Sequence, residues 1–120
     1  MAHNPGFLKL VNESKARVKQ TDVTGYKQMM AEPHVLVDVR EDSEWAAGHA
    51  KGAVHIGKGV IERDIETKVP DEATRVVLYC GGGFRSALAA DALQQIGYTD
   101  VISLDGGWKA IVEAGLPVEK

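Results

Sequence analysis

The chain has 120 residues, of which 44% are hydrophobic and 6% aromatic, a length that fits a single domain with one core. It carries 14 Lys and Arg against 17 Asp and Glu, a formal net charge of −3, which argues against a general nucleic-acid binder and a polybasic membrane binder. No apolar run approaches the roughly 20 residues that span a bilayer, and the first residues lack the apolar stretch of a secretory signal, so a cytoplasmic protein is expected.

The N-terminal part of the chain is predicted to be helical. Asn4-Pro5 offers an N-cap followed by proline at the first helical position, and apolar residues at near-helical spacing predict a helix over 5–17. We therefore expect residues 1–17 to form an N-terminal helical extension, followed by a short strand over 18–21 and a helix over 24–31.

Short apolar runs bounded by turn residues predict the strands of a sheet. They lie at 35–39, 76–79 and 101–104, with a weaker one at 53–56. The three stronger runs are continuous rather than alternating, as in strands covered on both faces. Stretches with helical spacing lie between and after them, at 42–47, 59–67, 85–96 and 107–114. This alternation predicts an α/β fold with a mainly parallel sheet flanked by helices.

Cysteine usage narrows the chemistry to one thiol. Cys80 is the single cysteine, which excludes an internal disulfide, a CxxC redox pair and a multi-cysteine zinc site. The four histidines lack the spacing of a metal motif, so a metal site is not expected. Ligands of parallel sheets collect beyond the carboxyl ends of the strands, and Cys80 directly follows the strand predicted at 76–79.

The segment after this strand has the features of an anion-binding loop. It reads Cys80-Gly81-Gly82-Gly83-Phe84-Arg85-Ser86. Glycines let the backbone wrap a small ligand with its N–H groups turned inward, and the following helix adds its partial positive charge. Arg85 brings a permanent cation, and this environment favours a nucleophilic thiolate. A lone cysteine is more often a small buried residue, but the whole loop favours a nucleophile; Ser86 would either cap the loop or donate to the sulfur.

Four motifs in a fixed order resemble one known family. They are Asp38-Val39-Arg40 with Glu44, Gly48-His49 followed by Gly52-Ala53, the Cys80–Ser86 loop, and Leu104-Asp105-Gly106-Gly107-Trp108 before Gly115-Leu116-Pro117. Together they are similar to the rhodanese (thiosulfate sulfurtransferase) family, over residues 18–118. The tight turn at 105–107 and Trp108 support the fold rather than the reaction.

The resemblance implies a single-domain, rhodanese-like sulfurtransferase with a five-stranded parallel sheet. Cys80 would accept a sulfane sulfur as a persulfide and pass it to a thiophilic acceptor, with residues 81–86 binding the substrate and no cofactor taking part. The implied partners are a small anionic sulfur donor and, as acceptor, cyanide, a small thiol such as glutathione or a protein thiol, for example that of a thioredoxin-like protein. The loop has no Lys and one Arg, so polysulfides and persulfides remain open as donors beside thiosulfate.

Two other functions remain as alternatives. A cysteine phosphatase or arsenate reductase of the same fold carries one residue more between its Cys and Arg than the four that separate Cys80 from Arg85. The shorter loop suits a smaller group, such as a terminal sulfur. The third hypothesis is a module of this fold that binds a protein or carries sulfur for a partner, which an intact Cys80 and Arg85 make less favoured.

Three residues outside the loop are predicted to support the site. Asp38 would accept hydrogen bonds from the loop or pair with an arginine, or it would only cap a turn with Asp42. Arg40 and Glu44 are four residues apart at a helix start and are expected to form an ion pair. His49 is expected to order a loop through hydrogen bonds rather than act as a base, since a preformed thiolate needs no proton removed.

Overall fold

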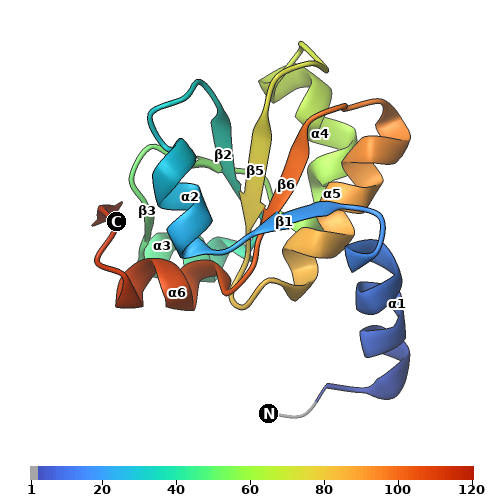
Figure 1. Ribbon diagram of the computed structural model, residues 1–120, viewed down its shortest axis with the longest axis horizontal. Coiled ribbons are helices and arrows are strands. Elements are labelled where there is room, and N and C mark those ends of the chain that lie inside the picture. The colour runs from blue at the N-terminus through green and yellow to red at the C-terminus, as the bar shows by residue number, and fades with distance from the viewer. Residues whose placement is uncertain (1–2) are drawn as a thin grey trace.

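The computed structural model describes residues 3–120 and has a parallel sheet at its centre (Figure 1). Its strands are β1 (Lys19–Thr21), β2 (Val35–Asp38), β4 (Val54–His55), β5 (Val76–Tyr79) and β6 (Val101–Leu104). Their order is β1-β6-β5-β2-β4, and every neighbouring pair is parallel. The predicted α/β fold with a five-stranded sheet is confirmed.

Helices cover both faces of this sheet. They are α1 (Pro5–Lys15), α2 (Val23–Met29), α3 (Asp42–Ala47), α4 (Ile61–Lys68) with the preceding 3₁₀ turn η1 (Lys58–Val60), α5 (Phe84–Ile96) and α6 (Gly107–Glu113). Figure 1 shows α4 and α5 on one side of the sheet and α2 and α6 on the other. None of the helices between His3 and Lys120 has the length and apolarity needed to cross a membrane.

The sequence of the central strand β5 is apolar throughout because both of its faces are buried. Val76 and Leu78 belong to the core cluster under α4 and α5, whereas Val77 and Tyr79 belong to the cluster under α2 and α6. All four side chains are fully buried. Because neither face of the strand meets water, no polar alternation is needed, as the continuous run predicted.

A second, two-stranded sheet was not predicted from the sequence. Strand β3 (His49–Ala50) pairs antiparallel with β7 (Val118–Glu119). Each strand has two residues, too few to show periodicity, and the partners are far apart along the chain. The remaining differences are at element ends: the helix expected over 5–17 ends at Lys15, and the strand expected over 35–39 ends at Asp38.

The N-terminal helix α1 packs along α5. Val11 is 1% exposed, and Ser14 donates a hydrogen bond of 3.0 Å to Asp91 on α5. Arg17, just beyond the helix, places its Nη2 2.6 Å from the same carboxylate, with Nε at 3.1 Å. The arginine holds the pKa of Asp91 below its ordinary value. An apolar contact and a shared carboxylate therefore fix α1 against the helix that follows the Cys80 loop.

A buried ion pair holds the carboxyl end of β2. Asp38 and Arg40 are 0% and 3% exposed; the Arg40 Nη2 lies 2.8 Å from Asp38 Oδ2 and 2.7 Å from the carbonyl oxygen of Gly48. The guanidinium also packs over the rings of Tyr79 and Trp108, at 5.7 and 4.6 Å. Losing one partner of such a buried pair costs about 3–5 kcal/mol, since the other charge is left unpaired.

The start of α6 touches the backbone of the loop after β5. The N–H groups of Trp108 and Lys109 donate to the carbonyl oxygens of Cys80 and Gly81, over 2.7 and 3.3 Å. Gly107 has a φ of +51°, and a Cβ there would collide with the Cys80 carbonyl oxygen and lie 2.9 Å from the carbonyl carbon of Gly81. Only glycine allows this approach without displacing the loop.

We expect Gly107→Ala to destabilise the protein far more than Gly115→Ala. Both glycines have positive φ, but a Cβ at Gly115 meets no atom within 4 Å. The control therefore carries only the strain of left-handed backbone, about 1–2 kcal/mol, whereas Gly107→Ala adds about 1–3 kcal/mol of overpacking. Urea unfolding of both variants measures the difference, and equal losses would contradict the close approach.

Candidate active site

The Cys80 sulfur lies at the carboxyl end of the central strand, inside the loop that leads to α5. The side chain is 1% exposed. Its Sγ accepts a hydrogen bond of 3.1 Å from the N–H of Gly83 and lies 3.6 Å from the Oγ of Ser86. That hydroxyl is in turn 2.9 Å from the Oγ of Ser103 on β6. The sulfur thus has a backbone donor and a hydroxyl chain on its buried side.

The backbone of Gly83 makes this arrangement possible. Its φ is +105°, and a Cβ there would lie 3.1 Å from Asp105 Oδ1 and 3.2 Å from the nitrogen of Gly106. The left-handed conformation lets the chain turn into α5 directly after the N–H that points at the sulfur. An N–H directed at a sulfur stabilises negative charge on it, which suits a thiolate or a persulfide anion at Cys80.

Arg85 pairs with the carboxylate of Glu44, which was predicted from its spacing to pair with Arg40. Its Nη1 and Nη2 lie 2.8 and 3.1 Å from the two oxygens of Glu44, which also accepts the N–H of Glu41 at 3.0 Å. The expected ion pair between Arg40 and Glu44 is therefore wrong: Arg40 turns inward to Asp38, where a buried cation requires its partner. The Arg85 guanidinium lowers the pKa of Glu44 to about 2, and the carboxylate raises that of Arg85.

A pocket of about 440 Å³ reaches the Cys80 side chain. It is lined by His3, Phe7, Cys80, Gly82, Phe84 and Arg85. Four of these belong to the predicted loop, whereas His3 and Phe7 were not singled out from the sequence. Gly83 and Ser86, also predicted, contact the sulfur from the buried side, and Gly81 lies beside the Arg85 guanidinium. The predicted loop residues therefore lie around the Cys80 sulfur, and His3 and Phe7 from the N-terminal segment complete the lining of the pocket.

The three predicted supporting residues do not line this pocket. Asp38 and Arg40 form the buried pair at the end of β2. His49 donates its Nδ1–H to the carbonyl oxygen of Trp45 at 3.0 Å and stacks on that ring at 3.5 Å between centroids; its Nε2 lies 3.5 Å from a Glu119 carboxylate oxygen. Within residues 3–120, no three His, Cys, Asp or Glu side chains gather as metal ligands.

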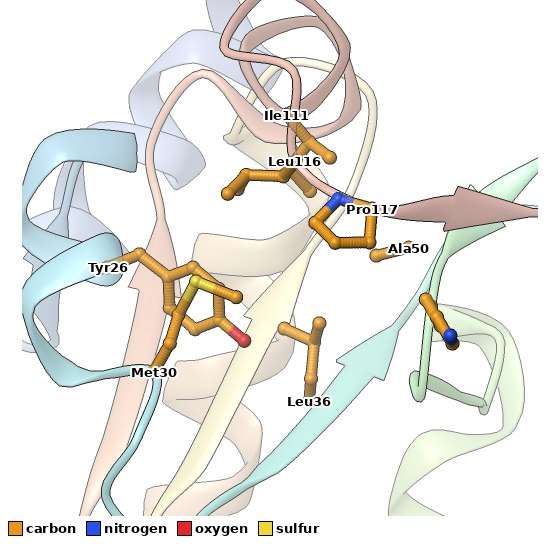
Figure 2. A pocket seen from close by; sticks show the side chains of 8 residues that line it. Tyr26, Met30, Leu36, Ala50, Ile111, Leu116 and Pro117 are labelled. Atoms are coloured by element: carbon orange, nitrogen blue, oxygen red, sulfur yellow. The ribbon is translucent and has the colours of Figure 1, made fainter.

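A second, smaller pocket lies over the other face of the sheet (Figure 2). It holds about 120 Å³ and is lined by Tyr26, Met30, Leu36, Ala50, Lys51, Ile111, Leu116 and Pro117. The Tyr26 hydroxyl lies 2.8 Å from His34 Nε2, and since His34 Nδ1 must donate to the Glu32 carbonyl, the hydroxyl is the donor to Nε2. Burial raises the pKa of Tyr26. The Tyr26 hydroxyl is thus protonated and hydrogen-bonded, and Cys80 lines the other pocket.

Comparisons with known proteins place the chain in a family. The family model of the rhodanese-like domain matches residues 22–114. Thiosulfate sulfurtransferase GlpE of Vibrio cholerae is 33% identical over 99 residues, which cover 82% of this chain and 92% of that protein. The probable adenylyltransferase/sulfurtransferase MoeZ of Mycobacterium tuberculosis is 41% identical over 73 residues, 60% of this chain but 18% of MoeZ.

A solved structure extends the likeness to nearly the whole chain. It is a protein of unknown function from Rhodopseudomonas palustris, described as a possible tyrosine phosphatase, with a TM-score of 0.81 at 26% identity over 99% of this chain and 98% of that one. With the family match over residues 22–114, these findings show that the chain belongs to the rhodanese-like family.

Proposed function

We propose that the protein is a sulfurtransferase that carries a sulfane sulfur on Cys80 as a persulfide, from a small anionic donor to a thiol or cyanide. The observation that carries the proposal is that Cys80 lines a pocket while the Gly83 N–H and the Ser86 hydroxyl contact its sulfur. Membership of a family that includes a named thiosulfate sulfurtransferase supports the same reaction class.

The proposed cycle has two displacements at sulfur. The Cys80 thiolate attacks the outer sulfur of thiosulfate, the S–S bond of the donor breaks, and sulfite leaves with the electron pair. The acceptor then attacks the terminal sulfur of the persulfide, and the Cys80 thiolate is released. Since the chain has one cysteine, a thiol acceptor must come from another molecule.

Phosphate or arsenate chemistry is the second candidate, favoured by the likeness to a possible tyrosine phosphatase. Two features weigh against it. Four residues separate Cys80 from Arg85, which gives a cradle smaller than that of cysteine phosphatases, and both outer nitrogens of Arg85 are engaged by Glu44.

A role as sulfur carrier for a dedicated partner uses the same persulfide and differs only in the acceptor.

Intact-protein mass spectrometry tests the persulfide directly. The reduced protein is expected to gain the mass of one sulfur atom after incubation with thiosulfate or polysulfide and to lose it on adding cyanide. Cys80→Ser should show no gain and keep a native circular dichroism spectrum, because serine fills nearly the same volume. A gain retained by Cys80→Ser, or none with any sulfane donor, would reject the mechanism; cleavage of an aryl phosphate lost in the same variant would favour the phosphatase.

Glu44→Gln is expected to lower the KM for thiosulfate about three- to tenfold, because Arg85 would become an uncompensated cation beside the pocket; this corresponds to about 0.7–1.4 kcal/mol. The matched control is Asp42→Asn, which removes the same charge from a fully exposed position on α3. Steady-state thiocyanate formation gives both values, and equal effects of the two variants would assign the change to net charge alone.

The Glu44–Arg85 pair also predicts a pH dependence. Because the pKa of Glu44 is lowered from its ordinary 4.5 to about 2, the stabilisation from the pair is present above the higher value and lost as the pH falls toward the lower one. The thiosulfate KM ratio between Glu44→Gln and the wild type should therefore be constant from neutral to mildly acidic pH. A ratio that already changes in the neutral range would mean that the pair titrates there.

A further inference from the structure

Three aromatic rings from two distant segments meet at the Cys80 pocket. The centroid of His3 lies 5.5 Å from that of Phe7 and 4.6 Å from that of Phe84, and the two phenylalanines are 6.2 Å apart. All three residues line the pocket together with Cys80. We call His3, Phe7 and Phe84 the aromatic wall.

Contacts between α1 and α5 hold the aromatic wall in place. Residue Phe84 opens α5, and its ring lies 4.8 Å from the ammonium of Lys15 on α1; that ammonium is also 3.8 Å from the Asp105 carboxylate. The contacts of Ser14 and Arg17 with Asp91 anchor α1 along the same helix. Phe7 and His3 precede the stretch 22–114 that matches the rhodanese-like domain, so the part of the wall that they form lies outside that match.

Beyond the backbone N–H groups of the Cys80 loop, the side chains that line the pocket offer little to a strongly hydrated anion. Among the described residues that line the pocket, Arg85 alone has a side chain with a permanent charge, and Glu44 engages it with two hydrogen bonds. An oxyanion that enters loses hydration, and aromatic faces do not replace those hydrogen bonds. In contrast, carbon groups and divalent sulfur pack favourably on aromatic rings, by about 0.3–1.5 kcal/mol per contact.

We propose that the aromatic wall makes the pocket prefer sulfane donors with an organic group beside the transferable sulfur over inorganic thiosulfate. The donor class is organic persulfides, R–S–S⁻, with thiosulfonates, R–SO₂–S⁻, as stable analogues. The Cys80 thiolate attacks the outer sulfur, the S–S bond breaks, and R–S⁻ or the sulfinate R–SO₂⁻ leaves with the electron pair while R packs on the wall. This inference rests on the proposed sulfurtransferase function and names its donor.

The test compares kcat/KM for benzenethiosulfonate, methanethiosulfonate and thiosulfate, with cyanide as acceptor. The wild type should prefer the benzene compound to thiosulfate. In Phe7→Ala, the ratio of these two kcat/KM values is expected to fall about three- to tenfold, with a smaller fall for the methane compound. The matched control is Leu10→Ala on the same helix, at a position 58% exposed and outside the Cys80 pocket, where the ratio should not change.

Phe7→Leu serves as a second variant, because it keeps most of the packing of α1 and removes only the ring. Its ratio of the two kcat/KM values should lie between that of Phe7→Ala and that of the wild type. A ratio unchanged in both Phe7 variants, or a wild type that prefers thiosulfate, would overturn the role of the wall. If thiosulfate loads Cys80 and the ratio does not move, this inference alone fails, whereas absence of loading by all three donors would reject the proposed function itself.

Discussion

The loop after β5 keeps its shape because the first turn of α6 donates backbone hydrogen bonds to it. With the carbonyls of Cys80 and Gly81 engaged by α6, the planar trans peptides point the N–H groups of Gly81 and Gly82 away from that helix. Gly83 then directs its own N–H to the sulfur. This arrangement requires glycine at position 107. A residue distant in sequence therefore helps to set the position of the Cys80 thiol.

The motif Asp38-Val39-Arg40 with Glu44 takes part in two ion pairs that have different structural roles. Asp38 and Arg40 are buried and tie the end of β2 to the Gly48 carbonyl. Glu44 and Arg85 are about a third exposed and connect α3 to the loop around the thiol. The first pair maintains the frame, since its charges cannot return to water, whereas solvent screens the second and leaves it free to tune the pocket.

The parts predicted best from the sequence are those governed by burial of whole strands. The mainly parallel sheet follows from apolar runs that are buried on both faces, its five strands follow from the family resemblance, and the loop after β5 follows from its glycines. The pairing of Arg40 with Glu44 was wrong because spacing along a helix ignores that an arginine side chain can turn inward to Asp38. The place of Phe7 beside Cys80 was missed because helical spacing identifies an apolar face but not the element it packs against. The pairing of β3 with β7 left no local signal at all.

The position of α1 also affects how the protein can be handled in the laboratory. Because His3 lies against Phe84 at the pocket, an affinity tag or fusion partner attached before it begins beside the pocket that Cys80 lines. The C-terminus instead follows β7, paired with β3 on the side of the molecule away from α1 (Figure 1). An N-terminal fusion therefore places additional chain next to the Cys80 pocket, whereas a C-terminal fusion leaves the surroundings of that pocket unchanged.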